Sequence, residues 1–127
     1  ANGDIGSPED AAAALAASGA DGVMLGRATQ GRPWAVRDVM CSLRGEDVPP
    51  PPSLAQLHAL ILRHYNDILE YYGARTGTPL ARKHLAWYVG GMCGANAFRE
   101  RVNKMSDPAQ VRGEIDALFA AQLGEAA

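Results

Sequence analysis

Residues 21–27 read Asp21-Gly22-Val23-Met24-Leu25-Gly26-Arg27. The apolar run at 23–25 is too short for a helix and is bounded by glycines, which predicts a strand that is buried on both faces. Gly26 allows the backbone to turn and to approach a ligand closely, and Arg27 adds a fixed positive charge at the end of the strand. In parallel α/β proteins, ligands bind at the carboxyl ends of strands, and phosphates favour the backbone N–H groups found there. This stretch therefore indicates a parallel strand with a candidate phosphate site at its end.

A second strand end lies upstream, at Ala1-Asn2-Gly3-Asp4-Ile5. Between the two, Ser7-Pro8 predicts a helix start, because serine caps well and proline suits the first helical position, and Gly19 predicts the helix end. Residues 1–27 thus predict one crossover unit of a parallel sheet. Two ordinary βα turns would have the same spacing, and spacing alone slightly favours that interpretation over a phosphate site. Because residue 1 already lies at a strand end, we expect the chain to be the C-terminal part of a longer protein.

The composition is that of a globular protein with one domain or two small ones. The chain has 127 residues, of which 47% are hydrophobic and 20% charged, and its net charge is −2. Neither a membrane span nor a signal peptide is predicted. Cys41 and Cys93 match no metal-ligand spacing, so we expect reduced core thiols of a cytosolic protein and no metal.

A proline run divides the chain. Upstream of it, Pro33 predicts the start of a helix that ends at Gly45. The expected inner face of this helix comprises Val36, Val39, Met40 and Leu43. The prolines at 49–52 predict an extended spacer. We therefore expect a domain of residues 1–46, a proline-rich linker of residues 47–52 and a second domain of residues 53–127.

The second domain is predicted to be a bundle of about four helices, and the chain as a whole to be mainly α. Ser53 predicts the start of a long helix that ends at Gly73, and Thr78-Pro79 the start of a second that ends at Gly90-Gly91. A third helix is expected over residues 95–105, and Asp107-Pro108 predicts the start of a fourth. The expected core residues are Leu54, Leu57, Leu60, Ile61, Tyr65, Ile68, Leu69, Tyr72, Leu80, His84, Leu85, Tyr88, Val111, Ile115, Leu118 and Phe119.

Positive charge is concentrated between Gly73 and Met105. This span carries six basic residues and one acidic residue, and the basic ones are Arg75, Arg82, Lys83, Arg99, Arg101 and Lys104. Such a face suits a nucleic-acid backbone, and a solvated surface is an equally open interpretation. Trp87, Tyr88 and Phe98 lie in the same span, and each is expected in the core rather than stacked on a base. For His84 the interpretations are, in order, a polar core residue, a backbone contact and an RNA contact.

Several segments resemble one enzyme family. Asn2-Gly3-Asp4-Ile5, the stretch 21–27 and Gly31-Arg32-Pro33-Trp34 resemble the end of the barrel in tRNA-dihydrouridine synthases. The string Ala81-Arg82-Lys83-His84-Leu85-Ala86-Trp87-Tyr88 and the pair Phe98-Arg99 resemble the helical domain of that family. The matches follow in order over most of the chain. The chain looks like a member of the bacterial branch whose proteins are sometimes labelled nitrogen-regulation proteins.

The resemblance implies a C-terminal βα piece of an FMN-binding (β/α)₈, or TIM, barrel followed by an all-α bundle. It also implies a cytoplasmic oxidoreductase in which NADPH reduces FMN, the flavin passes hydride to a uracil ring in tRNA, and a cysteine protonates the ring. Carried over to this chain, Asn2, Gly3 and Asp4 line the flavin site, and Gly26 and Arg27 hold the flavin phosphate. The charge pattern and the resemblance together predict that tRNA is bound by Arg75, Arg82, Lys83, His84, Arg99, Arg101 and Lys104.

The resemblance leaves the catalytic centre outside this chain. The catalytic cysteine of the family lies in an earlier part of the barrel, and neither Cys41 nor Cys93 fits its motif. We therefore expect no catalytic residue here, no activity of the chain alone and no tight retention of FMN. Two alternatives stay open: a non-catalytic helical RNA-binding module, and part of another FMN barrel reductase that acts on a free pyrimidine.

Overall fold

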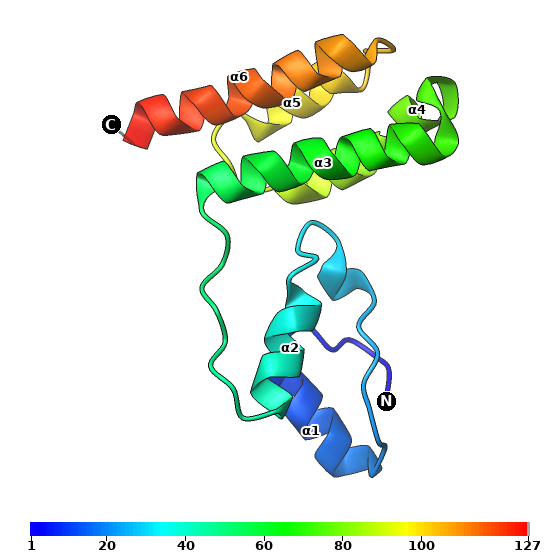
Figure 1. Ribbon diagram of the computed structural model, residues 1–127, viewed down its shortest axis with the longest axis vertical. Coiled ribbons are helices and arrows are strands. Elements are labelled where there is room, and N and C mark those ends of the chain that lie inside the picture. The colour runs from blue at the N-terminus through cyan, green and yellow to red at the C-terminus, as the bar shows by residue number, and fades with distance from the viewer. Residues whose placement is uncertain (127) are drawn as a thin grey trace. The chain divides into compact units, whose positions relative to one another are not determined.

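The structure is a computed structural model that describes residues 1–126 (Figure 1). The chain divides into two compact units, Ala1–Pro51 and Pro52–Ala127, which we call unit 1 and unit 2. Six α-helices and one short 3₁₀ helix make up the regular structure of the described residues, which confirms the mainly helical class. Within that range, no helix combines the length and the apolar character needed to cross a membrane.

Unit 1 contains α1 (Pro8–Ser18), η1 (Arg27–Thr29) and α2 (Ala35–Leu43). The predicted ends of α1 are confirmed. The Ser7 side chain accepts a hydrogen bond from the Asp10 N–H at 3.1 Å, and Gly19 has the left-handed conformation that ends many helices. Helix α1 packs against α2, and the small core between them contains Ile5, Ala11 and Val39.

The prediction of a strand buried on both faces within residues 22–25 is wrong. The described residues contain one isolated parallel bridge, between Asn2 and Met24, and no strand. The two segments therefore run parallel on either side of α1 in the sequence, as a crossover unit requires. However, the Met24 side chain is 62% exposed, and Val23 and Leu25 are only partly buried. A strand buried on both faces needs neighbouring strands and two layers of helices, and unit 1 provides one bridged segment and one layer.

The predicted inner face of α2 is correct at only one of its four positions. Val39 is buried, whereas Val36, Met40 and Leu43 are 43%, 44% and 42% exposed. Ala35 is buried in addition. Because α1 covers one narrow stripe of α2, the helical spacing of apolar residues alone overestimates how much of the helix is covered.

Unit 2 contains α3 (Leu54–Tyr72), α4 (Ala74–Val89), α5 (Ala95–Val102) and α6 (Pro108–Ala126). Helix α3 packs against α4 and α6, and α5 packs against α4 and α6 (Figure 1). Of the predicted core, Leu54, Leu57, Leu60, Leu69, Leu80 and His84 are only partly buried, and Tyr72 is 48% exposed. The buried core of this unit includes Ile61, Tyr65, Ile68, Leu85, Tyr88, Phe98, Val111, Ile115, Leu118 and Phe119.

Three of the four predicted helix starts in unit 2 are confirmed, including that of α5 at Ala95. Ser53 caps α3 in a reciprocal arrangement with Gln56, and α6 begins at Pro108. The start predicted at Thr78-Pro79 is wrong, because α4 begins at Ala74 and Pro79 lies inside it. Helix α5 ends at Val102, three residues before the predicted end at Met105.

The early start of α4 follows from its contact with α3. Gly73 has a φ of 78°, which only glycine adopts readily, and it reverses the chain between the two helices. A Cβ at Gly77 would lie 3.2 Å from the backbone oxygen of Ile68 and 3.2 Å from the Cα of Leu69. Glycine at this position therefore allows the close packing that stabilises the first turn of α4. Pro79, near the N-terminal end, removes only one backbone hydrogen bond.

The two cysteines are not core residues. Cys41 on α2 is partly buried, and Cys93, between α4 and α5, is exposed. The expectation of buried structural thiols is therefore wrong.

Candidate functional site

Unit 1 contains a concave site of about 740 Å³ at the bridged segments. All five residues predicted for the flavin site line it, together with Ile5, Gly6, Met24 and Ala28. The five predicted residues are Asn2, Gly3, Asp4, Gly26 and Arg27. They meet because the parallel bridge between Asn2 and Met24 brings the two segments together, so the next residues of each segment lie at the same edge.

Arg27 and Asp4 form an ion pair across this site. The Arg27 guanidinium donates to Asp4 Oδ1, and the two side chains are 82% and 84% exposed. Asp4 has a φ of 49°, an uncommon conformation that aspartate tolerates better than most residues. The pair fixes the direction of the guanidinium and leaves most of its five N–H donors for a ligand.

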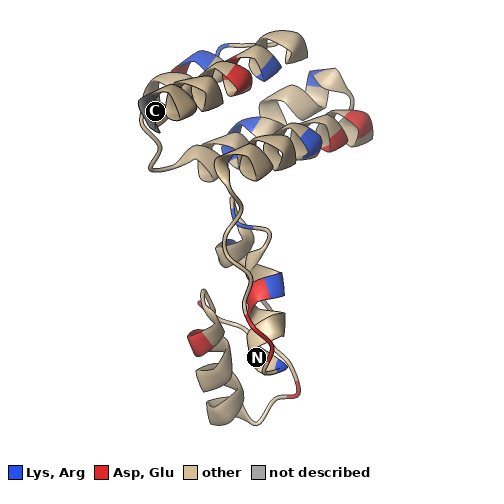
Figure 2. Cartoon of the chain, turned by 60° about the vertical axis from the view of Figure 1, so that its left-hand side comes forward, with Lys and Arg blue, Asp and Glu red and all other residues tan. Residues whose placement is uncertain are grey.

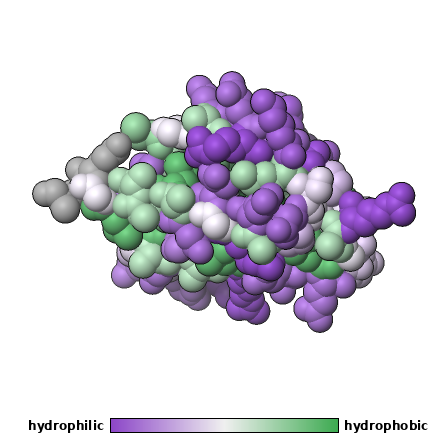
Figure 3. Space-filling model, turned by 90° about the horizontal axis from the view of Figure 1, so that it is seen from above, coloured by the Kyte–Doolittle hydropathy of each residue, from purple (hydrophilic) through white to green (hydrophobic). Residues whose placement is uncertain are grey.

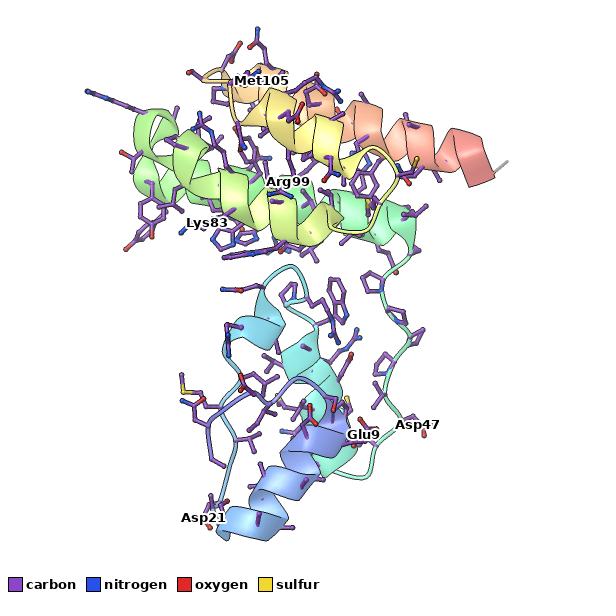
Figure 4. The ribbon with its side chains drawn as sticks, turned by 180° about the vertical axis from the view of Figure 1, so that it is seen from behind. Glu9, Asp21, Asp47, Lys83, Arg99 and Met105 are labelled. Carbon is purple, nitrogen blue, oxygen red and sulfur yellow. The ribbon has the colours of Figure 1, made fainter. Side chains whose placement is uncertain are left out.

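Unit 2 contains a groove of about 400 Å³ between α4 and α5. We call it the α4–α5 groove, and its lining residues are Pro79, Arg82, Lys83, Ala86, Trp87, Arg99 and Asn103. The α4 residues recur at intervals of three and four, so they form one helical face, and Arg99 and Asn103 are one turn apart on the other side. Figure 4 labels Lys83 on α4 and Arg99 on α5.

The lining of this groove carries only positive charge. Helix α4 contains Arg75, Arg82 and Lys83 and no acidic residue, whereas α3, α5 and α6 carry charges of both signs (Figure 2). The face of the molecule in Figure 3 shows hydrophilic residues around smaller hydrophobic patches. The α4–α5 groove therefore differs from the rest of unit 2 in the sign of its charge.

Lys83 and Arg99 carry charges with which no described side chain forms an ion pair. Both side chains are exposed, and among the described residues neither forms an ion pair. By contrast, Arg101 Nε lies 2.8 Å from Glu114 Oε2, so its charge is compensated. Arg75 and Lys104 are exposed but do not line the groove. The structure thus brings together three of the seven residues predicted to contact RNA: Arg82, Lys83 and Arg99.

Arg82 differs from the other two because it is anchored. It is partly buried, its Nη2 donates to the Met105 carbonyl oxygen at 3.1 Å, and its Nε is buried. Adjacent helical residues point about 100° apart, so one of the two faces the connection between α5 and α6.

Trp87 is not a core residue, which corrects the prediction, whereas Tyr88 and Phe98 are buried as predicted. The Trp87 side chain is 38% exposed and lines the α4–α5 groove. Its spacing of four residues from Lys83 and eight from Pro79 places all three on one face of α4. The spacing could have predicted that Trp87 lies beside Lys83, but the sequence analysis did not use it. The sequence analysis also did not identify Asn103 as a residue of the groove.

His84 does not line the α4–α5 groove and lies within a group of aromatic rings. Its ring centroid lies 5.2 Å from that of Trp87 and 5.1 Å from that of His64, and His64 Nδ1 lies 2.9 Å from the Tyr88 hydroxyl oxygen. Burial lowers the pKa of His84, and the nearby His64 and Lys83 lower it further. Because histidine ordinarily titrates near pH 6.5, His84 is neutral at neutral pH and adds no charge to the groove.

The described residues contain no group of three or more His, Cys, Asp or Glu side chains that could hold a metal ion.

Comparison with known proteins gives a consistent family match. The family model described as dihydrouridine synthase (Dus) matches residues 1–123. The chain is 43% identical over 115 residues to a probable tRNA-dihydrouridine synthase of Rickettsia typhi, covering 91% of this chain and 35% of that protein. It is 40% identical over 119 residues to tRNA-dihydrouridine synthase B of Pseudomonas putida, covering 94% of this chain and 35% of that protein.

A third relative gives the same result. Identity to tRNA-dihydrouridine synthase B of Xanthomonas axonopodis pv. citri is 44% over 124 residues, covering 94% of this chain and 37% of that protein. The chain therefore spans little more than a third of the length of the curated relatives that it matches.

Proposed function

This chain belongs to the dihydrouridine synthase family, and from that premise we propose that it forms the C-terminal part of a tRNA-dihydrouridine synthase that uses FMN and NADPH. In this proposal unit 1 binds the flavin phosphate and unit 2 binds tRNA. The observation that supports it most is the concave site of unit 1, where Asn2, Gly3 and Asp4 lie beside Gly26 and Arg27.

The residues of the unit 1 site fit an FMN phosphate. No heavy atom beyond the chain neighbours lies within 4 Å of the position that a Cβ would take at Gly3 or Gly26, so a ligand can approach both backbones. The Arg27 side chain is 82% exposed, and a guanidinium binds phosphate through two parallel hydrogen bonds. Arg27 and the backbone at Gly26 would hold the phosphate, and Asp4 would orient the guanidinium.

When bound, FMN supplies the hydride that reduces the uracil ring. We assign no catalytic residue to this chain, because neither Cys41 nor Cys93 lines the concave site. The general acid that protonates the ring would therefore come from another part of the enzyme. In unit 2, the α4–α5 groove would position tRNA through its phosphates, which contact basic side chains without reporting sequence.

Substitution of Arg27 tests the flavin site in the longer protein that contains this chain. Arg27→Ala should weaken FMN binding on the order of tenfold to a hundredfold, because a hydrogen bond to a charged group contributes roughly 1.5–3 kcal/mol. The measurement is the dissociation constant of FMN, obtained from the change in flavin fluorescence on binding.

Arg32→Ala is the matched control, since Arg32 is also an exposed arginine of unit 1 but does not line the concave site. It should leave FMN affinity unchanged. Equal FMN affinity of the Arg27→Ala variant and the unmutated protein would exclude Arg27 as a phosphate ligand. Absence of flavin from the unmutated protein would favour the alternative of a non-catalytic RNA-binding module.

A further inference from the structure

We propose that the α4–α5 groove binds one unstacked nucleotide of an RNA strand, with the base on Trp87 and the neighbouring phosphate between Lys83 and Arg99. This inference rests on the proposed function, in which unit 2 binds tRNA, and it names the part of the RNA that the groove takes. The groove, which has a volume of about 400 Å³, has an aromatic wall as well as basic ones.

The position of Trp87 suits stacking of a base on its indole ring. A tryptophan is usually well buried, yet this side chain is 38% exposed and lines the groove. Its ring is perpendicular to that of His84, at an interplanar angle of 90°, and His84 in turn contacts His64. Because these rings fix the indole before any ligand arrives, a base that stacks on it loses less conformational freedom in the complex.

Lys83 and Arg99 suit a phosphate at the same site. Both line the groove, both are exposed, and neither has an ion-pair partner in the part of the chain that the structure describes. Arg82 contributes charge from a fixed position, because its Nη2 is bonded to the Met105 carbonyl oxygen at 3.1 Å. The lining contains no acidic side chain that would repel a phosphate.

The combination favours an unpaired nucleotide over a duplex. In a double helix, neighbouring bases cover both faces of each base, so an indole ring cannot stack without opening the strand. A groove that bound only the phosphates of a duplex would require basic side chains but no exposed indole ring. Stacking on aromatic side chains accepts any base, and we therefore expect little base preference at this position.

The test compares two RNAs of equal length with the 127-residue chain: a single-stranded oligouridine and a blunt-ended duplex. Trp87→Ala should weaken binding of oligouridine about fivefold to about a hundredfold and leave the affinity for the duplex unchanged. Trp87→Phe, which keeps an aromatic face, should restore most of the loss. Stacking involves no charged group of the protein. The salt dependence of binding should therefore be the same in the unmutated chain and in the two Trp87 variants.

A second measurement reports the contact directly, without removal of the side chain. Trp34→Phe leaves Trp87 as the remaining tryptophan of the two in the chain, and saturating oligouridine should change its fluorescence. Unchanged fluorescence at saturation, or equal affinity of the Trp87→Ala variant and the unmutated chain, would overturn the stacking site. The proposed function would then survive if Lys83→Glu/Arg99→Glu still abolished binding, and both would fail if the unmutated chain bound no RNA.

Discussion

The double variant Lys83→Glu/Arg99→Glu should bind tRNA at least a hundredfold more weakly than the unmutated 127-residue chain. Each substitution removes a phosphate contact worth roughly 1.5–3 kcal/mol and replaces it with a repelling charge. Because both side chains are exposed and without ion-pair partners among the described residues, the helices should remain intact. The measurement is tRNA affinity by filter binding at several salt concentrations, with helicity checked by circular dichroism.

The matched control is Arg44→Glu/Arg63→Glu. It changes the net charge equally, and both arginines are exposed and lie outside the α4–α5 groove. Its loss of affinity should be severalfold at most, through long-range electrostatics. Arg82 is left unchanged, because its substitution would also remove the hydrogen bond to the Met105 carbonyl oxygen. Any loss of affinity could then come from lower stability rather than from a lost RNA contact.

Salt dependence separates specific phosphate contacts from general charge. The plot of log affinity against log salt should become less steep by about two units in the groove variant, about one for each lost phosphate contact. It should keep nearly its original slope in the control. Equal losses in the two double variants, or affinity that does not respond to salt, would contradict the assignment of the groove.

Phe98→Ala should lower the free energy of unfolding of unit 2 by about 3–5 kcal/mol. Phe98 is 1% exposed, and it lies on α5, which has only eight residues. A helix of this length is not stable alone in water, so α5 depends on packing against α4 and α6. The measurement is urea unfolding followed by the fluorescence of Trp87 in a Trp34→Phe background, which reports unit 2.

Tyr71→Ala is the control for this prediction. Tyr71 is 82% exposed, so its truncation should change the free energy of unfolding by no more than about 0.5 kcal/mol. An unchanged urea midpoint for Phe98→Ala would mean that the core of unit 2 does not include α5.

The features that could be predicted from the sequence are mostly local. The helix starts at Ser7-Pro8, Ser53 and Asp107-Pro108 depend on hydrogen bonds between residues close in the chain, and the structure has all three. The core residues of α6 were also predicted correctly, because α6 packs against both α3 and α5. The crossover pattern and the family resemblance together also predicted that Asn2 and Gly26 line the same site.

The features that could not be predicted depend on neighbours distant in sequence. Thr78-Pro79 has the residues of a helix start, but the close approach of Gly77 to Ile68 and Leu69 extends α4 back to Ala74. The exposure of Met24 reflects how little of unit 1 surrounds it. The anchoring of Arg82 depends on the position of the Met105 carbonyl oxygen, which no pattern within α4 specifies.

The proposed function makes this chain part of an enzyme that reduces uridine in tRNA. The most direct test incubates the longer protein with FMN, NADPH and an unmodified tRNA transcript, and measures dihydrouridine in the digested RNA by mass spectrometry. Dihydrouridine should form in the presence of NADPH, and its yield should fall strongly in the Lys83→Glu/Arg99→Glu variant. Reduction of free uracil or uridine with no dihydrouridine in the tRNA would contradict the proposed function.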